Sequence, residues 1–267
     1  MRVQAKDILC NNVREKLRQG KVVSSMTVRL TRGIEIVRIA KTAGFDSIYV
    51  DLEHSSFSLD TTGQICTAAM NIGIAAFVRV PANKPEWISR VLDGGALGII
   101  APHISSAEEA RAVVAAAKFA PLGERSAAGG LPHLEYRTFT ASEAYPVLNE
   151  ATMVMVQIET VAALEKADEI MAVQGVDMVM IGTNDLTADM GIPGAYDHPR
   201  LREAFVHTIA VCKKYGKFAG VGGLSSRPDL VEEFVKMGAR YVSTGTDLAF
   251  LLAACTGKAK QVEDIAL

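Results

Sequence analysis

The stretch TAGFDSIYVD, residues 42–51, joins a helical segment that ends at Gly44 to a short run of apolar residues. The same arrangement recurs in DGGALGIIAP at 93–102, VQGVDMVMIG at 173–182 and KMGARYVSTG at 236–245. Glycine tolerates the left-handed conformation that ends many helices, and a strand buried on both faces has a nearly continuous apolar sequence. The repeat therefore predicts parallel strands that alternate with helices.

Other apolar runs extend this pattern to eight strands, expected near residues 22, 46, 75, 97, 153, 176, 218 and 240. Helical patterns separate them, and SSAEEARAVVAAAKFA at 105–120 begins with a serine followed three residues later by glutamate, as in a capping box. Eight strands alternating with helices predict one (β/α)8 barrel (TIM barrel) domain over residues 1–267. A doubly wound open sheet is the alternative. The long segment 121–151 interrupts the rhythm, and long loops are usually functional or disordered.

Composition limits the class of protein. The formal net charge is −2, which gives no electrostatic reason to expect nucleic acid or an anionic membrane as a partner. The four cysteines lie far apart without metal-ligand spacing, as in reduced cytoplasmic proteins. No apolar run approaches the roughly 20 residues of a membrane span, and the N-terminus does not resemble a signal peptide. We therefore expect a cytoplasmic protein that acts on small molecules.

Polar side chains gather where the expected strands end, which is where barrel enzymes place their chemistry. IYVDLEHSSF at 48–57 places Asp51, Glu53 and His54 directly after a buried strand, and Arg79 ends the next one. Side chains able to bind metal, anion or proton follow later strands: His103, Gln157, Glu159, Asn184 and Asp185. This concentration predicts an active site at the barrel mouth.

Glu159 and Asp185 form the most specific pair, because each follows an apolar strand and the two strands are adjacent. Two neighbouring buried carboxylates need a cation to stay ionised, and their hard oxygen atoms suit Mg²⁺, Mn²⁺ or Co²⁺. In the alternative interpretation, both residues only cap the helices that follow them.

Arg79 ends the apolar strand FVRVP, where a guanidinium suits capture of a carboxylate or stabilisation of an enolate oxygen. The alternative is a surface ion pair. No expected strand has a lysine at its C-terminal end, so a Schiff base is disfavoured and metal is the expected electron sink.

The chain resembles the HpcH/HpaI class II pyruvate aldolases, which are metal-dependent members of the phosphoenolpyruvate/pyruvate barrel superfamily. Seven motifs that carry the resemblance occur in the family's order: VDLEHS, VRVP, VLDGGALGIIAP, GERS, VQIET, IGTNDLTADMG and STGTD. The resemblance covers roughly residues 20–255.

This resemblance implies that Glu159 and Asp185 hold the divalent metal, which pyruvate chelates through its carboxylate and keto oxygens. Arg79 would bind the keto oxygen that becomes the enolate. His54 would be the acid/base residue, paired with Asp93 from the same or another subunit.

The resemblance assigns supporting roles to further residues. Asp51 would orient water at the metal, and Gln157 would support the site. Backbone amides around Thr183 and Asn184 would receive the pyruvate carboxylate, and Arg125 would lie near the distal part of the substrate. The family commonly forms hexamers in which the last helix is exchanged between neighbours.

The expected reaction is reversible cleavage of a 4-hydroxy-2-oxo acid, either a hydroxy-oxo-dicarboxylate or a 2-keto-3-deoxy sugar acid, to pyruvate and an aldehyde. One alternative is a carbon–carbon lyase similar to citrate lyase or malyl-CoA lyase. The other is a non-catalytic barrel that binds an oxo acid.

Overall fold

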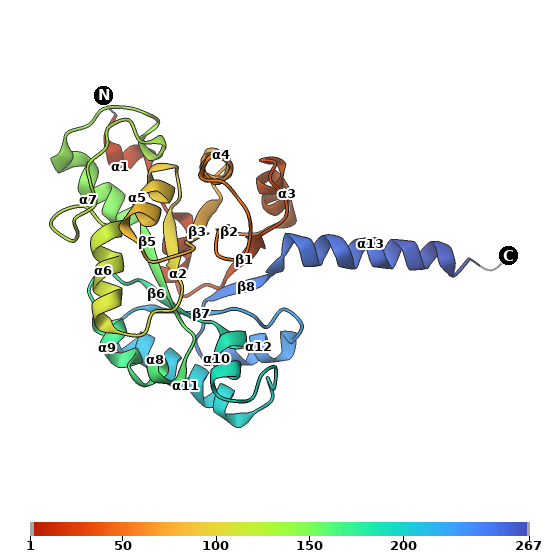
Figure 1. The fold of residues 1–267 in the computed structure, drawn as a ribbon. Coiled ribbons are helices and arrows are strands. Elements are labelled where there is room, and N and C mark those ends of the chain that lie inside the picture. The colour runs from red at the N-terminus through yellow and green to blue at the C-terminus, as the bar shows by residue number, and fades with distance from the viewer. Residues whose placement is uncertain (1–2, 266–267) are drawn as a thin grey trace.

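The computed structural model describes residues 3–265 and contains a closed barrel of eight parallel strands in sequence order (Figure 1). The strands are β1 (Val23–Val28), β2 (Ser47–Asp51), β3 (Ala75–Arg79), β4 (Gly98–Ala101), β5 (Met153–Ile158), β6 (Met178–Ile181), β7 (Phe218–Val221) and β8 (Tyr241–Thr246). β1 pairs with β8, with Val23 opposite Tyr241, and this pairing closes the ring. The predicted (β/α)8 barrel is therefore confirmed, and the open-sheet alternative is wrong.

Helices surround the barrel (Figure 1). They are α1 (Ala5–Ile8), α2 (Asn12–Arg18), α3 (Glu35–Ala43), α4 (Leu59–Asn71), α5 (Pro85–Asp93), α6 (Ala107–Ala117), α7 (Ala141–Ala151), α8 (Val161–Glu165), α9 (Ala167–Ala172), α10 (Thr183–Asp189), α11 (Pro199–Lys214), α12 (Pro228–Met237) and α13 (Asp247–Glu263), with a 3-10 turn, η1, at Pro132–Leu134.

Local sequence signals explain several element boundaries. Gly44 ends α3 with φ of 92° and Gly238 ends α12 with φ of 133°, and both values favour glycine. The hydroxyl of Ser106 accepts a hydrogen bond from the Glu109 amide at 3.2 Å, while the Glu109 carboxylate accepts one from the amide of Ser105 at 2.7 Å. These glycines and this cap determine where α3 and α12 end and where α6 begins.

The segment 121–151 packs under the barrel. Leu131, Leu134 and Leu148 belong to one buried apolar cluster with Leu9 and Val13 of the N-terminal segment. The same cluster contains side chains from the first residues of several strands, namely Val23, Ala75, Met153, Met178 and Tyr241. This long segment therefore closes the amino end of the barrel and leaves the carboxyl ends of the strands open.

The last helix, α13, points away from the barrel (Figure 1). Asp247 is its buried residue, and large apolar side chains such as Leu251 and Leu252 are 54% and 63% exposed. Within residues 3–265, no helix combines the length and apolar character needed to cross a membrane.

Candidate active site

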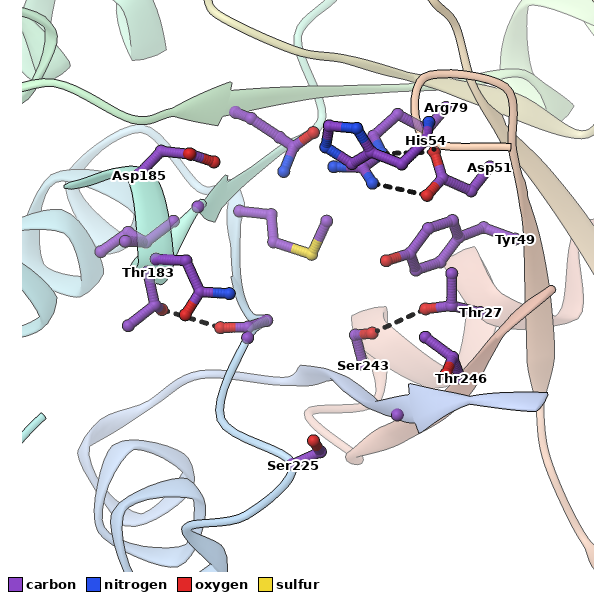
Figure 2. A pocket seen from close by; sticks show the side chains of 18 of the residues that line it. Thr27, Tyr49, Asp51, His54, Arg79, Thr183, Asp185, Ser225, Ser243 and Thr246 are labelled. Carbon is purple, nitrogen blue, oxygen red and sulfur yellow. Dashed lines mark hydrogen bonds and ion pairs between the residues drawn. The ribbon is translucent and has the colours of Figure 1, made fainter. Parts of the chain in front are cut away.

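A pocket of about 270 Å³ lies at the carboxyl ends of the strands. Most of the side chains that line it are polar, and Figure 2 shows Asp185 across the cavity from Asp51 and Arg79. The hydroxyls of Thr27 and Ser243 lie 3.3 Å apart, and Tyr49 lines the same pocket. The expected concentration of polar groups at this end of the barrel is present.

Arg79 and Asp51 form a two-point ion pair because β2 and β3 place them side by side in register. The Nε and Nη2 atoms of Arg79 donate to Oδ1 and Oδ2 of Asp51 at 2.9 and 2.7 Å. Burial raises the pKa of Asp51, but the hydrogen bonds and charge of Arg79 outweigh burial and hold that pKa below its ordinary value. Burial likewise lowers the pKa of Arg79, and the hydrogen bond to Asp51 reverses the effect and raises it. Both groups therefore stay charged, and the surface-pair alternative for Arg79 is wrong because its side chain is only 11% exposed.

Glu53 is a second carboxylate in contact with Arg79. Its Oε2 lies 2.9 Å from Nη1 of Arg79, in contact although not aligned as a hydrogen bond, and its Oε1 lies 2.8 Å from Nε2 of His103. Arg79 is therefore held by carboxylates on two sides, which fixes its guanidinium at the pocket wall.

Glu159 is buried and turns into the pocket. Its Oε2 accepts a hydrogen bond from the His103 amide at 2.8 Å and lies 2.6 Å from Nδ1 of the same residue. Gly182 makes room for it, because a Cβ there would lie 2.5 Å from Cγ of Glu159. Thr160, not Glu159, caps α8, and Asp185 makes no capping hydrogen bond in α10. The helix-cap alternative for these two carboxylates is therefore wrong.

The surroundings of Glu159 disfavour its ionised form. Burial raises the pKa of Glu159, the His103 amide and ring lower it, and the charges of Glu53 and Asp185 raise it again. The balance lies above the ordinary value, as expected for carboxylates that share one site.

A divalent cation fits these donors. Gln157 is 3% exposed, and its Oε1 has no hydrogen-bond partner in the described part of the chain. This orphaned oxygen lines the same pocket as the carboxylates of Glu159 and Asp185. Three hard oxygen donors suit Mg²⁺ or Mn²⁺. Residues 3–265 contain no ready-made cluster of three His, Cys, Asp or Glu ligands, so such an ion would rely on these two carboxylates and on non-acidic oxygens.

Three other predicted residues also line the pocket. His54 is exposed, with Nε2 3.7 Å from Oε2 of Glu53. Thr183 and Asn184 begin α10, where the first amides have no partner within the helix. The Thr183 hydroxyl donates to the carbonyl of Gly222 at 2.7 Å, which holds this turn against the next loop.

Asp93 and Arg125 lie elsewhere in the same chain. Arg125 donates through Nη2 to Oδ1 of Asp93 at 2.6 Å, and its guanidinium stacks over Phe119. Asp93 ends α5, and a barrel helix that starts at the carboxyl end of the strands finishes at their amino end. The expected pairing of Asp93 with His54 is therefore absent within one chain, and the part played by Arg125 in substrate binding stays a prediction that needs a second copy.

His103, which the sequence places after a strand, bridges Glu53 and Glu159 beside the pocket, and only its φ of 54° could not be predicted from the sequence. Three pocket residues escaped sequence reasoning. Arg29 directly follows β1 and lines the pocket. Its position at the end of a strand could have been used to predict that it lies at the barrel mouth. Tyr49 and Thr27 face the barrel interior, which the alternation of side chains along a strand could have indicated.

Known proteins match the whole barrel. Residues 31–254 match the family model described as HpcH/HpaI aldolase/citrate lyase. The chain is 37% identical to a 4-hydroxy-4-methyl-2-oxoglutarate aldolase of Hapsidospora irregularis, over 95% of this chain and 96% of that one. It is 32% identical to the 2-keto-3-deoxy-L-rhamnonate aldolase of Escherichia coli, covering 90% and 88% of the two chains. The crystal structure of an HpcH/HpaI aldolase from Desulfitobacterium hafniense superposes with a TM-score of 0.87 at 32% identity, covering 95% and 97%.

Proposed function

The chain belongs to the HpcH/HpaI aldolase/citrate lyase family and is a carbon–carbon lyase of the aldolase type, and we propose that it cleaves a 4-hydroxy-2-oxo acid with the help of a divalent metal ion. The products are pyruvate and an aldehyde or ketone. The observation that carries this proposal is that one pocket is lined by the Arg79–Asp51 pair, by Glu159 and by Asp185, with Asp185 across the cavity from the pair.

We assign Glu159 and Asp185 as the metal-holding residues, with Gln157 as a supporting oxygen. Support comes from the raised pKa of Glu159, the orphaned Oε1 of Gln157 and the lack of a side chain at Gly182. When bound, the ion supplies Lewis-acid polarisation of the 2-oxo acid group.

The residues of the chain account for the movement of electrons and protons. Cleavage breaks the C3–C4 bond, and its electron pair passes to C3 and is shared with the C2 oxygen as an enolate. Arg79 stabilises the negative charge that develops on this oxygen, a contribution typically worth about 10²–10³ in rate. His54 takes the proton of the C4 hydroxyl as the C4 carbonyl forms. A proton from water then completes pyruvate at C3.

Asp51 fixes the orientation of Arg79 through two hydrogen bonds. It also accepts hydrogen bonds from the amides of Glu53 and His54 at 3.1 and 3.2 Å, so the same carboxylate shapes the turn that carries the proposed base. Thr183 and Asn184, at the start of α10, are proposed to offer backbone amides to the pyruvate carboxylate.

A Schiff-base mechanism has a candidate lysine but in the wrong place. Lys118 is 3% exposed and burial lowers its pKa to about 8, as in imine-forming lysines. Its ammonium donates to the backbone carbonyls of Asn149 and Thr152 under the barrel. No lysine among the described residues lines the mouth pocket, so metal-assisted chemistry is favoured.

The two named relatives act on substrates that differ beyond the cleaved C3–C4 bond. A 4-hydroxy-4-methyl-2-oxoglutarate has a second carboxylate beyond the cleaved bond, whereas a 2-keto-3-deoxy-L-rhamnonate has hydroxyl groups there. Both substrates contain the same pyruvate half. The roles proposed for Arg79, Glu159 and Asp185 concern only this half.

We further propose that the protein assembles through α13 into a homo-oligomer, with a hexamer as the expected size. The exposed Leu248, Leu251 and Leu252 would be buried if the helix packed on another copy, and burial of apolar surface favours association. In that proposed assembly Asp93 of a second copy pairs with His54, and Arg125 lies near the distal part of the substrate. Light scattering coupled to gel filtration would test it, with Leu251→Glu expected to lower the mass.

The catalytic proposal is tested by coupling pyruvate release to lactate dehydrogenase over a panel of 4-hydroxy-2-oxo acids. The enzyme is first treated with a chelator and then supplied with Mg²⁺, Mn²⁺ or Co²⁺. We expect chelation, Glu159→Gln and Asp185→Asn each to abolish cleavage, and added metal to restore the wild type only.

Glu165→Gln is the matched control, because Glu165 is an exposed glutamate on α8 outside the pocket. It should retain wild-type activity. Full cleavage after thorough chelation would overturn the metal assignment, and lack of pyruvate release from the whole panel would overturn the proposed reaction.

A further inference from the structure

Arg29 places a second guanidinium in the pocket, at a position with no role in the mechanism above. It directly follows β1, and its side chain is 38% exposed. Its Nη2 donates to the backbone carbonyl of His54 at 2.8 Å. In the described part of the chain no partner is recorded for its Nη1, so this guanidinium can still donate hydrogen bonds toward the cavity.

Arg29 forms only a long ion pair with Asp51 and no aligned hydrogen bond to it. Its Nε lies 3.4 Å from Oδ2 of Asp51, whereas Arg79 approaches the same oxygen to 2.7 Å. Asp51 also accepts hydrogen bonds from two nitrogens of Arg79 and from two backbone amides, so Arg29 shares this carboxylate with several other donors. A partly exposed guanidinium at a pocket wall, whose neighbouring carboxylate is already bound by another arginine, is suited to receive a substrate carboxylate.

The loop that carries Arg29 is held in place by a buried carboxylate. Oδ1 of Asp247 accepts the amide of Arg29 at 2.9 Å, and Oδ2 accepts the amide of Thr31 at 2.7 Å. Both oxygens are also in hydrogen-bond contact with the amide of Leu30. A binding group on a fixed backbone loses less entropy when it meets its ligand.

The barrel topology sets Arg29 across from the proposed metal-holding wall. In a ring of eight strands in sequence order, β1 lies opposite β5, the strand that leads to Glu159. A substrate anchored at Glu159 and Asp185 by its 2-oxo acid end extends across a cavity of about 270 Å³ toward β1. The far end of a small substrate therefore reaches the neighbourhood of Arg29.

We propose that Arg29 binds a carboxylate on the part of the substrate released as the second product, so that the preferred substrate is a 4-hydroxy-2-oxo dicarboxylic acid. This inference rests on the aldolase function proposed above. Arg29 forms only an ion pair and exchanges no proton, and its role is substrate selection.

The test compares two substrates that differ in the distal group, 4-hydroxy-2-oxoglutarate and 4-hydroxy-2-oxopentanoate. The wild type should prefer the diacid in kcat/KM. Arg29→Gln should lower that preference by about 30-fold or more, as expected for loss of a charge-assisted, two-point contact. Arg29→Lys keeps the charge but not the fork geometry, and should lose less than tenfold.

Arg32→Gln is the matched control. Arg32 lies in the same loop and carries the same charge, but it donates to the hydroxyl of Ser56 and does not line the pocket. Its substrate preference should equal that of the wild type. An unchanged preference in Arg29→Gln, an equal loss in Arg32→Gln, or a wild type that does not prefer the diacid would overturn the assignment of Arg29.

Exchange of pyruvate methyl protons in deuterium oxide, followed by NMR, separates this inference from the proposed function. It reports on the pyruvate half alone. Wild-type exchange together with no effect of Arg29 on preference would reject only the role of Arg29. Absence of metal-dependent exchange would reject the aldolase proposal itself. If Arg29→Gln is poorly folded by thermal unfolding, the comparison of Arg29→Lys with Arg32→Lys decides the question in the same way.

Discussion

The carboxylate of Asp247 accepts the backbone amide of Thr31 at 2.7 Å and so ties the first residue of α13 to the loop after β1. Asp247 lies at the base of the helix that points away from the barrel, while the loop carries Arg29 to the pocket. The geometry of the proposed distal-carboxylate site therefore depends on a contact made by the helix that we propose as the assembly element.

Asp247→Ala should weaken both the fold and the selection of substrate. It leaves the part-buried amides of Arg29 and Thr31 without their acceptor. A hydrogen bond to a charged acceptor typically contributes about 1.5–3 kcal/mol, and chemical denaturation would measure the loss. The KM for the diacid should rise more than kcat falls. Asp264→Ala, at the exposed far end of α13, is the control and should change neither quantity. Wild-type KM and stability in Asp247→Ala would contradict this role.

Arg79→Lys should lower kcat by about 100-fold, because a lysine cannot reproduce the two-point contact with Asp51 or reach Glu53 at the same time. Steady-state cleavage and pyruvate proton exchange should fall together if the residue stabilises the enolate. Arg111→Lys, at an exposed position on α6, provides the same chemical change away from the pocket. A variant that cleaves slowly but exchanges pyruvate protons at the wild-type rate would show that Arg79 acts outside the enolate step.

The sequence predicted the barrel because its signals are local and repeated. Gly44 and Gly238 mark helix ends by their need for positive φ, and the apolar runs that follow leave few alternatives to buried parallel strands. Closure of the ring is not local, since it depends on Val23 meeting Tyr241 across the whole chain. Closure was inferred from the number of predicted strands, which is eight, and the structure confirms that the ring is closed.

The site was predictable where strand position alone determines which side chains meet. Asp51 and Arg79 end neighbouring strands, and register brings them together. Asp93 and Arg125 could not be placed this way, because their contact depends on how the segment 121–151 packs under the barrel. His103 reaches Glu53 and Glu159 only through an unusual backbone conformation, which residue identity does not reveal.

Acid should destabilise the protein through His133. Its Nε2 lies 2.9 Å from the carbonyl of Ala96, which requires a proton on that nitrogen, and burial lowers the pKa of the ring to about 4. The unfolded state has a pKa near 6.5, so it binds the proton first as the pH falls. The stability is complete above pH 6.5 and is lost as the pH falls toward 4, by about 2 kcal/mol between pH 7.5 and 5.

Urea denaturation at several pH values would measure this loss. His133→Gln keeps a donor for the Ala96 carbonyl but does not titrate, so its free energy of unfolding should depend less on pH over this range. His207→Gln, at an exposed position on α11, should retain the wild-type slope. Equal slopes in all three proteins would show that His133 does not cause the acid sensitivity.

Gly182→Ala should weaken metal binding without changing the fold. Gly182 has φ of −77°, which alanine adopts readily, but a Cβ would lie 2.5 Å from Cγ and 2.6 Å from Oε1 of Glu159. The carboxylate must therefore move, and mutation of a residue that positions a metal ligand typically costs about 10–100-fold in affinity. Titration calorimetry with Mn²⁺ would give the change, and cleavage should recover in part at high metal concentration. Gly129→Ala adds the same methyl group in open space and should bind Mn²⁺ like the wild type. Wild-type affinity in Gly182→Ala would remove Glu159 from the set of proposed ligands, because its carboxylate cannot keep its present place beside that methyl group.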